Sequence, residues 1–389
     1  MTTISRMLAR CEEELHDAAQ RKVGFHEFGD PRYREGLRVF LESLDNDRQL
    51  TEAGRLVWCD IIVGLLSARL YAQRGWIEQP EVLAVQVRRP LFIVGLPRSG
   101  TTVLHKLLSL DGQFQGLEWW LSQAPMVRPL RETWDTRAEY QESVARLEYL
   151  YRRIPEQRKA HEIIAGEVEE CIPVLMQSFR STLFSHPTPL PTYDAWLAGQ
   201  NASESYRYYA NVLRLVGARD SRMRWLLKCA FHMVEIGALF ELFPDACIIH
   251  THRDPLRSIQ SLFSLLNMNP QTEYECQSAV NGVQQCIYWR DALERTHAMY
   301  QKRPDKFFHV YNREFREQPL CTIRSIYEYF GLTLSSDAEQ RMRAWIAASP
   351  LSKYGEHKYV SGPWRLDGHQ ICEIFANYRA RHQFSGDRG

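Results

Sequence analysis

Residues 90–102 read Pro-Leu-Phe-Ile-Val-Gly-Leu-Pro-Arg-Ser-Gly-Thr-Thr, and the rest of the predicted fold is built around them. Its first half, Leu91 to Val94, is a short apolar run that predicts a strand buried on both faces. Its second half, Gly95 to Thr102, combines glycine, proline and small hydroxyls and predicts a tight loop. The apolar spacing of residues 103–108 predicts a helix. A strand, a glycine-bounded loop and a helix together form a phosphate cradle, in which loop amides and the helix dipole converge on an anion.

The loop differs from the nucleotide P-loop at one decisive position. Gly95 and Gly100 have the spacing of G-x-x-x-x-G-K-[ST], but Thr101 stands where that pattern has lysine. ATPases and GTPases need this lysine on the β- and γ-phosphates, so the present loop must hold phosphate by other means. A basic residue lies inside the loop instead, as Arg98. A tight turn without a ligand is the alternative interpretation of these residues.

Composition narrows the class of protein. The chain has 389 residues, enough for one large domain or two ordinary ones, and 44% of them are hydrophobic, enough for a sizeable core. A net charge of +1 argues against a broad nucleic-acid surface. The N-terminus lacks the apolar stretch of a secretory signal, and the run from Ile61 to Leu66 is too short to cross a bilayer. We therefore expect a cytoplasmic protein without nucleic-acid or membrane partners.

Cysteine and histidine spacing indicates reduced thiols and no metal site. The nine cysteines are odd in number and include no C-x-x-C pair, which is typical of buried thiols in a reducing cytoplasm. His161-Glu162 begins like the zinc-protease motif H-E-x-x-H, but the fifth residue is Ala165. His250 and His252 alternate on a predicted strand, where packing or a structural hydrogen bond is favoured over a metal pair.

The chain is expected to divide into a helical arm and an α/β domain. Residues 1–88 show helical spacing of apolar residues, with Thr51 as the N-cap of a helix that turns Leu56 inward. Residues 89–389 form the α/β domain. Within it, residues 117–222 show no clear strand, and we expect them to form a helical and loop insertion that covers the active site.

Three more strands are expected, over residues 224–228, 246–252 and 307–311. Helical stretches separate them, and this alternation predicts an α/β fold with a parallel sheet flanked by helices. Ligands of such sheets bind at the carboxyl ends of the strands. The residues expected at these ends are the loop 95–102, Lys228, Arg253 and Tyr311.

These motifs resemble the PAPS-dependent sulfotransferase family, where PAPS is 3′-phosphoadenosine 5′-phosphosulfate. Pro-Arg-Ser-Gly-Thr-Thr after a buried strand is similar to the family's 5′-phosphosulfate loop. Arg253 at a strand end, with Ser261 eight residues later, is similar to its 3′-phosphate motif. The H-E and E-E-C segments at 161–162 and 169–171, the strand ending in Lys228, and K-x-G-x-H-x-Y from Lys353 look like the bacterial branch. The loop and the strand-end lysine are also similar to those of tyrosylprotein sulfotransferases.

The resemblance implies a P-loop-like sheet, PAPS as donor and 3′-phosphoadenosine 5′-phosphate (PAP) as product, without a metal. The implied and candidate cofactor-binding residues are Pro97, Arg98, Ser99, Gly100, Thr101, Thr102, Arg253, Ser261, Tyr311, Lys353 and Lys358. Arg98 and Lys228 are implied to stabilise the charge that develops on the leaving phosphate. Two departures stand out: Cys229-Ala230 follows the lysine, where the branch has [Ser/Asp]-Pro, and Val103 replaces the adenine-stacking Trp of animal relatives.

The general base has several candidates. Glu118 lies twenty residues after Arg98, close to the position of the catalytic glutamate in tyrosylprotein sulfotransferases. His161 and Glu162 form the branch's own H-E pair. His232 follows Lys228 by four residues, whereas the animal enzymes have their histidine two after the matching lysine. The sequence leaves these alternatives open.

The expected function is sulfuryl transfer from PAPS to a hydroxyl or amine of a small-molecule acceptor. The aromatic residues that would shelter a partly apolar acceptor, unless they belong to the core, are Trp119, Trp120, Tyr193 and Trp196. A P-loop kinase of a small metabolite and a non-catalytic nucleotide-binding module are the alternatives. A protein-kinase function is excluded, because His252-Arg253-Asp254 lacks the asparagine that must follow five residues after the aspartate. The acceptor and the oligomeric state cannot be predicted.

Overall fold

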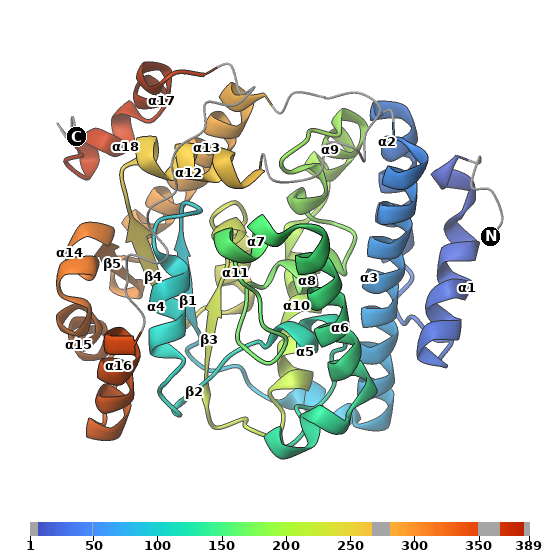
Figure 1. The fold of residues 1–389 in the computed structure, drawn as a ribbon, viewed down its shortest axis with the longest axis horizontal. Coiled ribbons are helices and arrows are strands. Elements are labelled where there is room, and N and C mark those ends of the chain that lie inside the picture. The colour runs from blue at the N-terminus through green and yellow to red at the C-terminus, as the bar shows by residue number, and fades with distance from the viewer. Residues whose placement is uncertain (1–6, 49, 267–280, 349–365, 385–389) are drawn as a thin grey trace.

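The computed structural model describes residues 7–48, 50–266, 281–348 and 366–384. Its centre is a five-stranded parallel sheet with the order β2-β3-β1-β4-β5 (Figure 1). The strands are β1 (Leu91–Gly95), β2 (Phe114–Gln115), β3 (Arg224–Lys228), β4 (Cys247–His252) and β5 (Phe307–Tyr311). The predicted α/β fold with a helix-flanked parallel sheet is thereby confirmed, and four of these strands lie where the apolar runs predicted them.

The strand register brings the expected ligand-binding ends together. Gly95 lies opposite Thr251 on the neighbouring β4, and His252 lies opposite Tyr311 on β5. Lys228 pairs with Ile93 on the other side of β1. The loop after β1 therefore emerges between the ends of β3 and β4. The sequence did not predict β2, because its two residues are too few to show any alternation.

Successive side chains of β1 enter two different cores. Leu91 and Ile93 pack with α4 (Thr101–Leu108), α15 (Pro319–Tyr329) and α16 (Ser336–Ala348). Phe92 and Val94 face the larger core, built with α10 (Ala202–Val216), α11 (Ile236–Leu242), α12 (Pro255–Leu266) and α13 (Gly282–Lys302). All four strand residues are fully buried, and each contributes roughly 1.5–3 kcal/mol of apolar burial.

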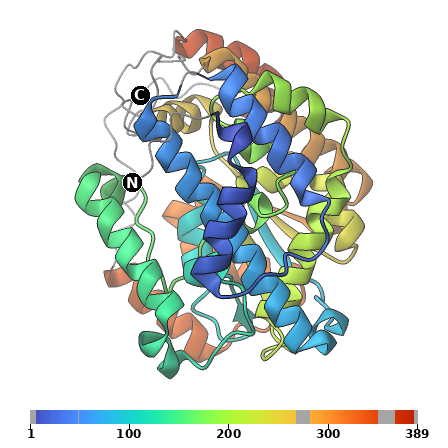
Figure 2. The same ribbon diagram turned by 90° about the vertical axis from the view of Figure 1, so that its right-hand side faces the viewer.

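The N-terminal helices are α1 (Glu12–Val23), α2 (Tyr33–Asp47) and α3 (Glu52–Glu78). Figure 2 shows the dark-blue α1 lying in front of α3 on this side of the molecule. The Thr51 side chain accepts a hydrogen bond from the Gly54 amide, as expected of an N-cap. Leu56 was predicted to point inward, but it is 50% exposed, because it lies in the first turns of α3, before the part of the helix that packs into the core. Arg69 of α3 is buried and donates a hydrogen bond to the carbonyl oxygen of Gln177. This bond links α3 to the segment of residues 117–222.

One helix among the described residues, α3, is long and apolar enough to cross a bilayer by length and composition. Of the most apolar 18 residues of this helix, 44% are buried inside the fold. Core helices pass the same test, so this is weak evidence for a membrane span.

Most of residues 117–222 are helical or irregular. The helices of this segment before α10 are α5 (Trp119–Gln123), α6 (Ala138–Arg153), α7 (Pro155–Ala160), α8 (Ile172–Met176) and α9 (Pro191–Ala198). The C-terminal helices are α14 (Asn312–Glu317), α17 (Gly368–Ile374) and α18 (Ala376–Arg381). Short 3₁₀ turns are η1 (Leu8–Arg10), η2 (Pro80–Ala84), η3 (Arg131–Thr136), η4 (Thr182–Ser185), η5 (Ala230–Met233) and η7 (Pro304–Lys306). The division into arm, domain and insertion remains a prediction.

Candidate active site

The loop after β1 requires both of its glycines. Gly95 has φ +147°, and a Cβ there would lie 2.2 Å from Oγ1 of Thr251. Gly100 has φ +97°, and a Cβ there would lie 2.4 Å from Nδ2 of Asn312. Arg98, between them, is also left-handed, with φ +69°. Left-handed backbone is costly for a residue with a side chain, so the loop holds a shape that the surrounding structure must impose.

Hydrogen bonds within the loop, to β4 and to the start of α14 hold that shape. The Ser99 hydroxyl lies 2.6 Å from the carbonyl oxygen of Leu96 and 2.6 Å from Oγ1 of Thr251. The Asn312 amide donates to the carbonyl oxygen of Ser99 at 2.9 Å. The loop then leads into α4, whose first-turn amides have no acceptor within the helix. This arrangement of preset amides at a helix N-terminus suits a phosphate oxygen.

The residues expected at the 3′-phosphate also meet at this loop. The guanidinium of Arg253 donates to the carbonyl oxygen of Arg98 at 2.8 Å. Nε of Arg98 donates to Oγ of Ser261 at 3.2 Å. Arg253 follows β4 directly and Ser261 lies in α12, so the first turns of this helix bring the two residues to the same loop.

Lys228 lies at the other side of the loop and is almost completely buried. Its Nζ contacts Thr102 Oγ1 at 3.3 Å, Glu169 Oε1 at 3.2 Å and Glu170 Oε1 at 2.9 Å. Burial opposes the charge of Lys228, but the two carboxylates outweigh it and raise its pKa above the ordinary value. Lys228 is therefore a positive charge fixed beside the first turn of α4.

The two glutamates differ in their surroundings. The Glu169 side chain is 7% exposed and also lies 3.4 Å from Nε2 of His161. Burial alone raises the pKa of Glu169, but Lys228 and His161 outweigh it and hold the pKa well below its usual range. The Glu170 side chain is 24% exposed, so it reaches the rim of the site. A backbone hydrogen bond from Cys171 to the carbonyl oxygen of Lys228 holds this segment against β3.

The two residues of the H-E pair, His161 and Glu162, contact different parts of the structure. His161 faces Glu169 and so joins the Lys228 cluster. Glu162 instead accepts from Nε of Arg158 at 2.8 Å, a pair on the surface of α7 and its C-terminal end.

Glu118 lies in a separate ion-pair cluster. Its carboxylate accepts from Nε of Arg128 at 3.2 Å, and Arg128 also binds Asp220 and the side chain of Gln115. Asp220 precedes β3, whereas Lys228 ends that strand, so this cluster lies near the amino end of β3 and Lys228 lies at its carboxyl end. Burial raises the pKa of Glu118 and Arg128 partly offsets that effect.

His232 belongs to the core. It is fully buried, its Nδ1 lies 2.8 Å from the Tyr206 hydroxyl, and its ring packs edge-on against Phe92. Burial lowers its pKa to about 3, so the ring is neutral at physiological pH.

The remaining expected residues have mixed placements. Tyr311 ends β5, and its hydroxyl lies 3.2 Å from Nδ1 of His382. Lys353 and Lys358 lie outside the described residues. Of the predicted aromatic cover, Trp120 and Tyr193 are fully buried and belong to the core.

The sequence did not single out Thr251, Asn312, Glu169 or Glu170 as site residues. Thr251 is the last residue but one of β4, and Asn312 directly follows β5 as the first residue of α14; these positions next to strand ends were the available signal. Glu169 and Glu170 come from an irregular segment between α7 and α8, so only the tertiary structure brings them to Lys228.

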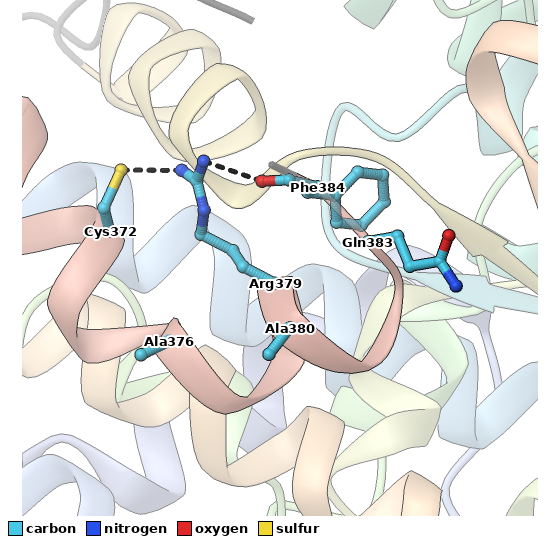
Figure 3. A pocket seen from close by; sticks show the side chains of 6 residues that line it. All are labelled: Cys372, Ala376, Arg379, Ala380, Gln383 and Phe384. Atoms are coloured by element: carbon cyan, nitrogen blue, oxygen red, sulfur yellow. Dashed lines mark hydrogen bonds between the residues drawn. The ribbon is translucent and has the colours of Figure 1, made fainter. Parts of the chain in front are cut away.

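A hollow of about 500 Å³ lies on the C-terminal helices (Figure 3). Its lining residues are Cys372, Ala376, Arg379, Ala380, Gln383 and Phe384. Arg379 crosses it, donating to Sγ of Cys372 and to the carbonyl oxygen of Phe384, and also pairs with Asp254 at 3.1 Å. The hollow contains no residue of the Lys228 cluster, so it does not define an acceptor pocket.

Comparisons with known proteins agree with this geometry. The profile of the sulfotransferase family matches residues 90–336, which is more than half of the chain. Omega-hydroxy-beta-dihydromenaquinone-9 sulfotransferase Stf3 from Mycobacterium bovis, like its counterpart from Mycobacterium tuberculosis, is 25% identical over 274 residues. This match spans 66% of the present chain and 66% of each relative, just under two thirds of their length.

Two solved structures match along almost the whole chain. Sulfotransferase STF1 from Mycobacterium tuberculosis H37Rv has a TM-score of 0.85 and 33% identity, covering 96% of this chain and 100% of that one. Sulfotransferase STF9 from Mycobacterium avium has a TM-score of 0.85 and 25% identity, covering 98% of both chains. The expectation drawn from the loop and strand-end motifs is confirmed: the chain belongs to the sulfotransferase family.

Proposed function

We propose that the protein transfers a sulfuryl group from PAPS to a hydroxyl or amine of a small-molecule acceptor and releases PAP. The observation that carries this proposal is the position of Lys228. Its buried ammonium lies between Thr102, at the start of the loop helix, and the carboxylates of Glu169 and Glu170. The ammonium of Lys228 therefore lies between the loop proposed to bind phosphate and carboxylates that can accept a proton.

The residues present fit the two phosphate groups of PAPS. The space beside Gly95 and Gly100 admits no Cβ, and the first-turn amides of α4 are suited to the 5′-phosphate. Arg253 and Ser261 supply one charged and one neutral donor for the 3′-phosphate. PAPS brings the activated sulfuryl group; the chain's residues bind it and hold charge around it.

Lys228 and Arg98 are proposed to stabilise the charge that develops on the leaving phosphate. Because Lys228 is buried and already paired, it is oriented before the reaction and needs little reorganisation. Its raised pKa keeps it protonated throughout the physiological range.

Glu170 is the general base that the geometry supports best. It touches Lys228 from the exposed rim of the cluster, where an acceptor hydroxyl can approach. Glu169 is more deeply buried between Lys228 and His161, which suits a positioning role. Of the candidates from the sequence, Glu118 is held by Arg128, Glu162 by Arg158, and His232 is enclosed in the core. His161 remains the second candidate through its contact with Glu169.

Support for the acceptor class comes from the relatives. The Stf3 proteins are named for an omega-hydroxy substrate, which favours a hydroxyl acceptor on a partly apolar molecule. The eight described cysteines carry reduced thiols, which supports a reducing, cytoplasmic setting.

An acceptor screen with labelled PAPS tests the proposed function. Label should move to hydroxyl compounds and PAP should appear in equal amount. Turnover of ATP with magnesium in place of PAPS would favour the kinase alternative, and tight PAP binding without any transfer would favour a binding module.

The base is tested with Glu170→Gln. Loss of general-base catalysis should lower kcat roughly a hundredfold, while PAP affinity stays near that of the wild type. Glu167→Gln is a matched control, since Glu167 lies in the same segment but pairs with Lys106. Glu118→Gln and His161→Ala complete the series. Wild-type kcat in Glu170→Gln would contradict the assignment.

A further inference from the structure

Three histidines gather on one face of the sheet, apart from the Lys228 cluster. His250 and His252 are two residues apart on β4, so both point to the same face. His309 lies directly opposite His250 on β5. One ring nitrogen from each of the three lies within 4.8 Å of those of the other two. Only strand pairing produces this group, because His309 is far from the other two along the chain.

The histidine cluster is buried, and one of its ring nitrogens has no hydrogen-bond partner among the described residues. His250 is 4% exposed and His252 is 1% exposed. Among the residues that the structure describes, Nε2 of His250 has no hydrogen-bond partner. Buried polar nitrogens in folded proteins almost always have a partner, so this nitrogen is available to a ligand at the cluster.

The other two histidines are arranged so that one cation can replace one proton. Nε2 of His252 and Nδ1 of His309 are 2.7 Å apart and share a single proton. On the other side of its ring, Nδ1 of His252 lies 2.7 Å from the hydroxyl of Tyr378. When Nδ1 donates to Tyr378, Nε2 presents a lone pair, and the second ring nitrogen of a metal-bound histidine is usually held in this way.

We propose that His250, His252 and His309 bind one divalent transition-metal ion of the zinc type. Imidazole nitrogens suit such ions, and three ligands with an open fourth position are a common zinc arrangement. Metal–nitrogen bonds of about 2.0–2.1 Å in a tetrahedral site separate the nitrogens by about 3.3 Å. The His252–His309 separation of 2.7 Å is shorter than that value, and the upper limit of 4.8 Å for the three nitrogens is longer, so metal binding requires small shifts of these side chains.

Binding of a metal through Nδ1 of His309 requires this ring to change its tautomer, so that the proton between His252 and His309 moves to Nε2 of His309.

This site is separate from sulfuryl transfer, for which the chain supplies amides and charged side chains. Its position gives it a structural consequence, because Arg253 follows His252 and Tyr311 follows His309 by two residues. A bound ion would tie the carboxyl ends of β4 and β5 together behind the proposed 3′-phosphate site. From the sequence, packing was favoured over metal binding for His250 and His252, because only two of the three proposed ligands lie close together along the chain.

The test is metal binding by the full-length chain, freed of metal with a chelator and desalted. We expect one Zn²⁺ per chain, a rise in Tm on adding Zn²⁺, and a Co²⁺ spectrum typical of nitrogen ligands without a thiolate charge-transfer band. His309→Gln should weaken Zn²⁺ binding by about tenfold or more. His297→Gln is the matched control, because His297 is half-buried in α13 near the same face but is not among the three ligands.

Each other outcome overturns the proposal. No bound Zn²⁺ and no change in Tm for the wild type would do so directly. A thiolate band in the Co²⁺ spectrum, or Zn²⁺ binding that persists in His309→Gln and disappears on thiol alkylation, would assign the metal to cysteines. If His309→Gln does not fold, the wild-type Co²⁺ spectrum and the variant His250→Gln decide the question.

Discussion

Replacing Lys228 with methionine removes the central charge of the proposed active site while keeping much of its volume. The Lys228 side chain is 1% exposed, and its partners Glu169 and Glu170 are 7% and 24% exposed. Removing one member of a buried ion pair costs about 3–5 kcal/mol, because the remaining charge is left buried without compensation. We expect Lys228→Met to lose about that much free energy of unfolding at pH 7.

The same variant should lose less as the pH falls. The pKa of Glu169 is lower in the folded state than in the unfolded state, so its pairing stabilises the fold above the unfolded pKa, and this contribution is lost as the pH falls from that value through the folded pKa. In Lys228→Met the main cause of the lowered pKa is gone. The difference from the wild type should therefore narrow as the pH falls below the ordinary glutamate pKa of 4.5.

Urea unfolding at several pH values measures both effects. The double variant Lys228→Met/Glu169→Gln should cost less than the sum of the single variants, by about 0.5–3 kcal/mol. Lys22→Met is the control, because Lys22 pairs with Glu142 at the surface and should lose less than about 1 kcal/mol. A loss of under about 1 kcal/mol in Lys228→Met, or a loss that is independent of pH, would refute the reasoning.

Three further outcomes are expected. Arg253→Ala should remove a charge-assisted contact of about 1.5–3 kcal/mol, and calorimetry should then show PAP binding weakened roughly ten- to a hundredfold. Arg343→Ala is the control variant. Equal affinity of the wild type for PAP and ADP would contradict the assignment of Arg253 to the 3′-phosphate. Sulfuryl transfer should survive EDTA, since side chains and amides supply the charge stabilisation; a loss that magnesium restores would favour the kinase alternative. Gly100→Ala should lower the free energy of unfolding by about 1–3 kcal/mol and weaken PAP binding, because the backbone of Gly100 is left-handed and a Cβ there would meet Asn312. Gly237→Ala is the control, because a Cβ at Gly237 meets nothing within 4 Å, and this variant should bind PAP normally.

Much of the proposed phosphate-binding half of the candidate site was predictable, because its signals are local. The apolar run 91–94, the glycines of the loop and the apolar spacing after Thr101 each lie within a few residues, and local conformational preferences decide what such stretches form. Arg253 and Ser261 were also within reach of the sequence, since a strand end and the helix that follows it place them on one side.

The partners of Lys228 required the tertiary structure. Glu169 and Glu170 lie in an irregular segment whose position depends on backbone contacts with Leu117 and Lys228, which no periodicity reveals. For the same reason Glu118 looked like a base beside the loop helix, whereas the structure places it with Arg128. The orientation of an irregular segment is decided by distant contacts rather than by its own residues.

The family, the parallel sheet and the shape of the proposed phosphate loop could be predicted from the sequence, because each depends on short local patterns. Only the tertiary structure decided which charges surround Lys228 and that His309 joins His250 and His252. Both groups form across strands and segments that are distant in the chain, and the packing of the sheet, rather than local preference, brings them within a few ångströms of each other.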